Sequence, residues 1–283
     1  FCDEMRNLIA SNPNRSILIE LNTVRTAQDV FGSLDPSLNR YFLSSQIVPL
    51  DRQPRINDIR ADLAAGNPTV VVTTQVIEAG VDLDFDLAVR DIGPIDSIIQ
   101  TAGRCNRNGL RPAAASHFHI YRITNDQGHL FARRIYGIVA MDIAETLLDR
   151  RTAVPRMLTQ YYQEIEHRTR GITSDEIIAG IRDLDYDDVH EKFRLIDQQY
   201  NVPVFVDLDD DATEIWRRFV ALSNQTRPSR AELRRLRPDM EQYMIGVAET
   251  QVTNLGLQEE NHIFYVDRAA AGVLYNRMTG FVR

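Results

Sequence analysis

Apolar and polar residues follow one another along the first half of the chain in a pattern that predicts strands separated by helices. Val70–Val72 is a short β-branched apolar run, which is typical of a strand buried in a parallel sheet. Further strand patterns occupy residues 16–23, 41–45 and 117–124. The alternation over residues 1–127 therefore predicts an α/β domain, a parallel sheet with helices on both faces.

The pattern changes after residue 127. Residues 128–237 carry apolar residues at helical spacing, as in helices that pack one face against a neighbour. Residues 238–283 alternate apolar and polar positions over short stretches, which predicts a small β-containing module. We expect a lobe at 1–127, a helical linker at 128–237 and a C-terminal accessory domain at 238–283. The acidic run Asp207–Asp211 lacks the glycine and terminal glutamate of an EF-hand loop and is expected to be a solvated turn.

The octapeptide QTAGRCNR, residues 100–107, carries the strongest chemical signal in the chain. Arg104 and Arg107 would share one face of the segment if it were helical. A guanidinium group keeps its charge and binds phosphate oxygens through two parallel hydrogen bonds. Gly103 would let the backbone pass close to a ligand. The pattern indicates phosphate chemistry, although two arginines at this spacing also occur on ordinary solvated helices.

Other segments of the sequence favour phosphate chemistry over a solvated helix face. VVVTTQVIEAGVD at residues 70–82 resembles motif V of superfamily 2 helicases, and Q-x-x-G-R-x-x-R resembles motif VI. Residues 16–23 resemble motif IV, so the three motifs occur in the order expected of such motors. The wording NTVRTAQDVF, TTQVIEAGVDLDFD and QTAGRCNRNG further resembles one family, the helicase–nuclease of type I CRISPR–Cas systems.

The resemblance implies a RecA-like fold for the lobe and a part in an ATP-driven motor. In this family the motor pulls single-stranded DNA into an HD nuclease after the Cascade surveillance complex has opened an R-loop. The resemblance implies catalytic roles in ATP hydrolysis for Gln100, Arg104 and Arg107. It implies nucleotide contacts for Gly80, Asp82 and Gly103.

Hydroxyl side chains at strand ends are the expected contacts to the tracked DNA strand. Thr73 and Thr74 end one strand and Thr23 ends another, and carboxyl ends of parallel strands meet at the edge where such folds place ligands. Ser45 belongs to a Ser-Ser pair that stands where related helicases often have His-Ser. Threonine is also a good strand residue, and Ser45 is equally consistent with a solvated strand end.

Two motifs of a complete motor are not found in this chain. It has no G-x-x-x-x-G-K-[ST] sequence and a single lysine, Lys192, so the loop that cradles ATP phosphates is not encoded here. No D-E-x-[HD] tetrapeptide occurs either, and the Mg²⁺ ligands are expected on a first RecA-like lobe outside the chain, which begins at Phe1. We expect a fragment or subunit of an ATP- and Mg²⁺-dependent assembly, inactive by itself and without a metal site.

Net charge, hydrophobic runs and cysteines limit the classes of protein to which the chain can belong. A net charge of −8 argues against a broad nucleic-acid-coating surface but not against contacts in a narrow channel. No run of 18 apolar residues and no signal peptide occurs, and Cys2 and Cys105 offer no disulfide framework, so a cytoplasmic protein without membrane contact is expected. Two alternatives stay open: a lobe of another superfamily 2 DNA or RNA helicase, and a non-catalytic docking module for a partner protein.

Overall fold

The computed structural model describes residues 1–78, 82–109, 111–112, 116–125, 127–150, 154–169, 174–186, 201–225 and 229–281. The chain forms two compact units. One consists of Phe1–Val89, Arg104–His119 and Tyr200–Arg283, and the other of Arg90–Gly103 and Ile120–Gln199.

A five-stranded sheet with the order β2-β3-β1-β4-β5 organises the N-terminal part of the chain. β3 (Val70–Thr73) lies between β1 (Ile17–Glu20) and β2 (Arg40–Leu43) and pairs in parallel with both. β4 spans Leu87–Asp91 and β5 spans His117–Tyr121. Every residue of β1 and β3 is buried, as their nearly continuous apolar sequences predicted. The predicted α/β fold is confirmed.

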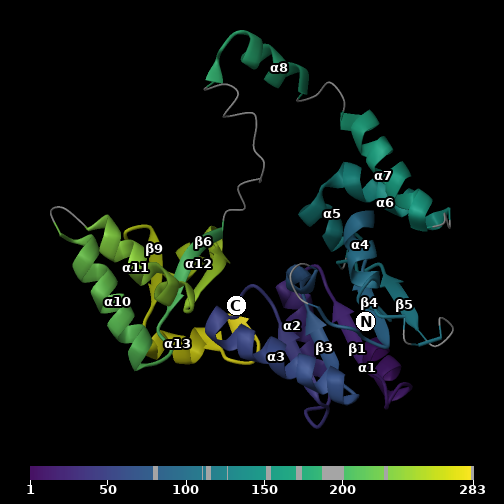
Figure 1. Cartoon of the computed structure of the whole chain (residues 1–283), viewed down its shortest axis with the longest axis horizontal. Coiled ribbons are helices and arrows are strands. Elements are labelled where there is room, and N and C mark those ends of the chain that lie inside the picture. Colours follow the sequence, from purple (N-terminus) through teal and green to yellow (C-terminus); the bar gives the residue numbers. More distant parts are fainter. Residues whose placement is uncertain are drawn as a thin grey trace. The chain divides into compact units, whose positions relative to one another are not determined.

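Three helices accompany the first strands of this sheet: α1 (Cys2–Ala10), α2 (Val24–Ser33) and α3 (Pro49–Ala65). α2 contacts β3 and α3 contacts β2 (Figure 1). After β3 the described chain makes one 3₁₀ turn, η1 (Gln75–Ile77). The shared core contains Leu18, Leu43, Ile59, Val71 and Phe85.

The second unit is mainly helical. Its described helices are α4 (Ile95–Ala102), α5 (Phe131–Tyr136), α6 (Ile138–Asp149), α7 (Val154–Thr169) and α8 (Ser174–Arg182). α7 packs against both α6 and α4, and the pairing of α6 with α7 can be followed in Figure 1. Gly137 has a φ of +82°, a conformation that glycine adopts readily, and it separates α5 from α6.

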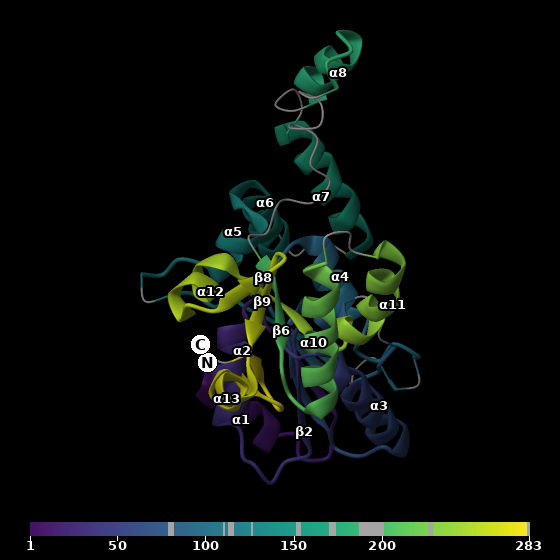
Figure 2. The ribbon, with the colours of Figure 1, turned by 90° about the vertical axis from the view of Figure 1, so that its left-hand side faces the viewer.

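A second sheet, with the order β7-β6-β9-β8, lies in the C-terminal part of the chain. Its strands are β6 (Asn201–Val206), β7 (Met244–Ala248), β8 (Gln258–Glu260) and β9 (Ile263–Val266). α10 (Asp210–Ser223) and α11 (Arg230–Glu241) pack side by side, as Figure 2 shows. Their apolar faces meet Phe205 of β6 in a core with Trp216, Phe219, Leu236 and Met240.

The rest of this region consists of α12 (Glu249–Leu255), α13 (Arg268–Leu274) and a hairpin of β10 (Tyr275–Asn276) with β11 (Gly280–Phe281). We call residues 201–281 the C-terminal module. In its sheet, β6 pairs with β7 and β9. β6 precedes the boundary expected at 237/238, and β7 and β9 follow it. The division into 1–127, 128–237 and 238–283 stays a prediction.

The acidic run does not form the solvated turn that was expected. Asp207 is buried, with only 2% of its surface exposed. Its carboxylate accepts hydrogen bonds from the Tyr265 hydroxyl at 2.8 Å and from Arg268 Nε at 3.0 Å. Asp209 caps α10 by accepting from the Ala212 amide at 2.9 Å. Asp209 also accepts from the Tyr243 hydroxyl at 3.0 Å, whereas Asp210 and Asp211 stay exposed. Local sequence does not reveal the distant partners of Asp207 and Asp209.

The β10–β11 hairpin of the C-terminal module packs against the loop that follows β2, residues 44–48, within the same compact unit. Phe281 N donates to Gln46 O at 3.1 Å. The Tyr275 hydroxyl accepts from Val48 N at 3.0 Å and bonds Asp51 Oδ2 at 3.1 Å. Arg55 of α3 reaches back and donates to Met278 O at 2.7 Å. The C-terminal end of the chain therefore fixes the loop that carries Ser45.

Candidate functional site

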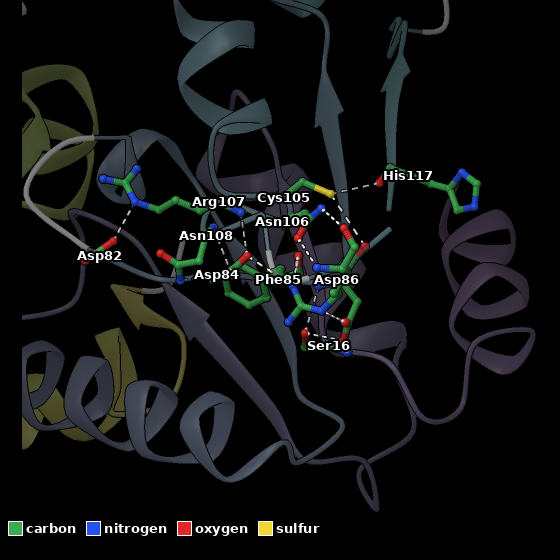
Figure 3. Close-up of polar contacts among 11 residues, drawn as sticks. Ser16, Asp82, Asp84, Phe85, Asp86, Cys105, Asn106, Arg107, Asn108 and His117 are labelled. Carbon is green, nitrogen blue, oxygen red and sulfur yellow. Dashed lines mark hydrogen bonds and ion pairs between the residues drawn. The ribbon is translucent and has the colours of Figure 1, made fainter. Parts of the chain in front are cut away.

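The segment after α4 is fixed against the segment that precedes β4. Phe85 N donates to Arg104 O and Asn106 N donates to Phe85 O, both at 2.9 Å. These bonds make a short parallel bridge between Phe85 and Cys105. Because the paired residues lie side by side, the arginine motif comes next to the aspartates at 82, 84 and 86 (Figure 3).

Arg104 is a buried residue of this motif. Its side chain donates to two backbone carbonyls at the end of η1, from Nη2 to Glu78 O at 2.9 Å and from Nε to Ile77 O at 3.4 Å. Only 8% of the residue is exposed. Burial, and then the charge of Arg107, lower the pKa of the Arg104 guanidinium, which nevertheless stays charged at neutral pH. Arg104 therefore ties the two helicase-like motifs together.

Arg107 is placed differently. Its side chain is 42% exposed and pairs through Nε with Asp82 Oδ1 at 2.7 Å, and the Asp82 side chain is itself 80% exposed. In Figure 3 the two side chains extend away from the rest of the cluster. α4 ends at Ala102, so the two arginines lie in a turn and do not share the face of a helix. Of the two, Arg107 is the one that solvent reaches.

Two aspartates of the extended segment DLDFD, Asp84 and Asp86, hold the motif in place. Asp84 accepts from the Arg107 amide at 2.8 Å and from the Asn108 side-chain amide at 3.2 Å. Asp86 accepts from Ser16 N at 2.7 Å and pairs with Arg111. No motif in the sequence singles out Asp84, Asp86 or Arg111 as functional residues. The available signal was the every-second-residue spacing, which puts alternate side chains on one face of an extended chain.

Gln100 and Gly103 belong to the end of α4. Gln100 is exposed in its last turn. Gly103 follows with an ordinary right-handed conformation, φ −66°, and a Cβ there would lie 3.3 Å from Gln100 O. A larger residue at position 103 would therefore press against the last carbonyl groups of α4. Gly80 lies outside the described residues, so its expected nucleotide contact stays a prediction, as do those of Gln100 and Gly103.

The four expected DNA contacts differ in what their hydroxyls do. Thr23 is the N-cap of α2 and accepts from Thr26 N at 3.1 Å. Thr73 is fully buried and donates to Thr74 O at 2.9 Å. Thr74 is 4% exposed, and no hydrogen bond of its hydroxyl is seen among the described residues. Ser45 is exposed in the turn after β2. Thr74 and Ser45 therefore keep hydroxyls that no described neighbour uses.

Comparison with known proteins agrees with the resemblance. Residues 13–110 match the family described as CRISPR-associated nuclease/helicase Cas3, C-terminal. A CRISPR-associated nuclease/helicase Cas3 of Methanothermobacter thermautotrophicus is 27% identical over 199 residues, which cover 67% of this chain and 24% of that protein. The resemblance inferred from the motifs is confirmed: this chain matches the C-terminal part of Cas3 proteins.

Solved structures share the fold. The crystal structure of T. fusca Cas3-ATP superposes with a TM-score of 0.60 at 18% identity, covering 94% of this chain and 37% of that one. A chain of the CRISPR RNA-guided surveillance complex, pre-nicking, superposes with a TM-score of 0.58 at 19% identity, covering 95% of this chain and 41% of the other. The chain thus spans a quarter to two fifths of the length of these relatives.

Among the described residues, no group of three or more His, Cys, Asp or Glu side chains is arranged to hold a metal ion. None of the described helices has both the length and the apolar composition that crossing a membrane requires.

Proposed function

We propose that this chain supplies the arginine-bearing lobe of an ATP-driven single-stranded DNA translocase, acting with a first RecA-like lobe that carries the phosphate-binding loop. The observation that carries the proposal is the position of Arg107. Its guanidinium is solvent-accessible at the end of a loop whose backbone is fixed on Asp84. A fixed backbone with an exposed, permanently charged fork suits stabilisation of phosphate charge during hydrolysis.

The pairing of Arg107 with Asp82 fits this role. Both side chains are largely exposed, and an ion pair of this kind contributes only about 1 kcal/mol or less. A phosphate group can therefore replace Asp82 at small cost. ATP bound at this lobe supplies the anionic oxygens that Arg107 binds. Arg104 holds the loop against residues 77 and 78, and its positive charge lies near Arg107. Mg²⁺ is expected to be held by carboxylates of the first lobe.

The DNA path is proposed to follow the edge of the sheet where β1, β2 and β3 end. Thr74 and Ser45 offer hydroxyls without a described partner. Thr23 and Thr73 lie at neighbouring strand ends, where their hydroxyls bond Thr26 N and Thr74 O. Hydroxyl contacts to phosphate carry no base information, so translocation is expected to be independent of sequence. By analogy with the Cas3 relatives, the strand would be fed to an HD nuclease after the Cascade complex has exposed it.

The isolated chain, residues 1–283, is expected to hydrolyse ATP no faster than background and to bind ATP weakly. The reason is that positioning and charge neutralisation of the phosphates depend mainly on the phosphate-binding loop and its Mg²⁺. Phosphate release with and without single-stranded DNA measures this. DNA-stimulated turnover by the purified chain would contradict the two-lobe proposal. An assembly with the first lobe that binds partners but never hydrolyses ATP would instead support a docking module.

Replacing Thr74 by valine is expected to weaken single-stranded DNA binding several-fold and to reduce DNA stimulation of ATP hydrolysis. Valine keeps the β-branched shape that the buried strand end requires and removes only the hydroxyl. Binding of fluorescent oligonucleotides by the two-lobe assembly measures the effect, which should be the same for all base sequences. Thr69→Val, just before the other end of β3, is the control: its hydroxyl bonds Asn67 O and the Asn39 side chain, so this variant should lower the melting temperature and leave DNA affinity unchanged. A lower melting temperature with unchanged DNA affinity would make Thr74 a core residue.

A further inference from the structure

The loop that carries Arg107 is held by several hydrogen bonds to a single carboxylate, that of Asp84. We propose that Asp84 is the positioning residue that sets where the Arg107 guanidinium lies, an inference that rests on the proposed role of Arg107 in ATP hydrolysis. Asp84 does not touch the guanidinium of Arg107. It acts on the backbone from which that side chain extends.

Four donors converge on the Asp84 side chain, which is 15% exposed. Oδ1 accepts from Arg107 N at 2.8 Å and from Arg111 Nη1 at 3.3 Å. Oδ2 accepts from Asn108 N at 3.4 Å and from Asn108 Nδ2 at 3.2 Å. Figure 3 shows Asp84 facing Arg107 and Asn108 from the extended segment. One carboxylate thus holds two consecutive backbone amides and an arginine beyond them.

The loop is also closed by a backbone bond in which Gly109 N donates to Asn106 O at 3.0 Å. It contains no helix or strand between Asn106 and Asn108, and Asn106 adopts a left-handed conformation with φ +51°, which Asn tolerates better than most residues. Asn106 closes the loop by donating to Arg111 O at 2.8 Å and accepting from Arg111 N at 3.0 Å. Arg111 is in turn held by Asp86 at 2.5 Å. Of these side chains, Asp84 is the one that bonds the backbone amide of Arg107.

Asp82 and Asp84 therefore act on Arg107 in different ways. Asp82 occupies the guanidinium and has to give it up when phosphate binds. Asp84 keeps its bonds to the backbone whichever partner the guanidinium has. A reacting group displaced by about 1 Å can lose roughly 10²-fold in rate, so a loosened loop should slow hydrolysis without removing any group that binds ATP.

The test is Asp84→Asn in the two-lobe ATP-hydrolysing assembly. Asparagine has the same shape, but one of its two acceptor oxygens becomes an NH₂ group that faces other donors. We expect kcat for ATP hydrolysis to fall about 10- to 100-fold while KM for ATP changes less than about 3-fold, the signature of an interaction needed in the transition state. Hydrogen exchange at the Arg107 and Asn108 amides should accelerate.

Asp62→Asn is the matched control. Asp62 also accepts several hydrogen bonds, from Tyr41 at 2.6 Å and from the Asn39 and Asn67 side chains, each at 2.8 Å. These bonds, with that from Tyr41 first, lower the pKa of its carboxyl group. It bonds none of the residues from Arg104 to Arg111. This variant should lose comparable hydrogen bonding and keep kcat, so a fall in kcat common to both variants would mean general destabilisation and overturn the proposal.

Combining Asp84→Asn with Arg107→Ala separates this inference from the function on which it rests. If Asp84 acts through Arg107, the double variant should have the kcat of Arg107→Ala alone. An equal further loss in the Arg107→Ala background would overturn the positioning role and leave the function of Arg107 intact. So would an Asp84→Asn variant with normal kcat. An Arg107→Ala variant with normal kcat would overturn the proposed function itself, and the inference with it.

Discussion

Arg107→Ala is expected to lower kcat for ATP hydrolysis by about 10³-fold or more in the two-lobe assembly, with a much smaller change in ATP affinity. Arginines that act on the transferred phosphate contribute roughly 10³–10⁵ in rate. Their charge is needed most where phosphate charge develops in the transition state, so the loss should appear in kcat. Steady-state hydrolysis and binding of a non-hydrolysable ATP analogue measure the two quantities.

Two further arginine variants make this result interpretable. Arg107→Lys keeps a positive charge but loses the planar fork and should not restore turnover, whereas near-normal turnover with lysine would show that the fork is not used. Arg217→Ala, at an exposed position on α10, should be neutral. Arg104→Ala should also abolish turnover, and in addition it removes the donors to Ile77 O and Glu78 O. That variant alone should therefore lower the melting temperature.

Gly280→Ala is expected to destabilise the chain by about 2–5 kcal/mol, from a left-handed alanine and from overpacking. Gly280 has a φ of +83°, and a Cβ there would lie 2.7 Å from the Gln46 carbonyl carbon and closer still to its oxygen. The neighbouring Phe281 N also donates to that oxygen at 3.1 Å, so neither backbone can move away without losing the bond. Urea unfolding of the chain, monitored by tryptophan fluorescence, measures the change.

Two other glycines of the C-terminal module serve as controls. Gly256 has a φ of +62° with nothing near its Cβ position, so Gly256→Ala should cost only the backbone term, about 1–2 kcal/mol. Gly272 lies in α13 with open space around it, and Gly272→Ala should stabilise by about 0.5–1 kcal/mol. Equal losses at positions 256 and 280 would show that the Gln46 backbone yields easily and that the hairpin is loosely docked.

Local sequence was sufficient to predict the parallel sheet. A short β-branched apolar run such as Val70–Val72 favours a strand and, because its side chains are apolar on both faces, a buried one, so strand and burial follow from the same residues. These features depend on residues close together in the sequence, and the structure has them where they were expected.

The different positions of Arg104 and Arg107 depended on partners far along the chain. Ile77 and Glu78 bury Arg104, whereas Asp84 fixes the Arg107 backbone and leaves its side chain accessible. The local sequence does not distinguish the two residues, because both are arginines and each is followed by a small or polar residue, Cys105 or Asn108.

The burial of Asp207 had the same cause. Its partners Tyr265 and Arg268 lie almost sixty residues away, and β6 pairs with strands beyond the expected boundary. A carboxylate in an acidic run is solvated by default, and only specific donors brought together by the fold make its burial tolerable. The sequence by itself thus determined the sheet, the motif order and the residue chemistry. The tertiary structure decided which charged groups are buried and which stay accessible, because burial depends on contacts between distant parts of the chain.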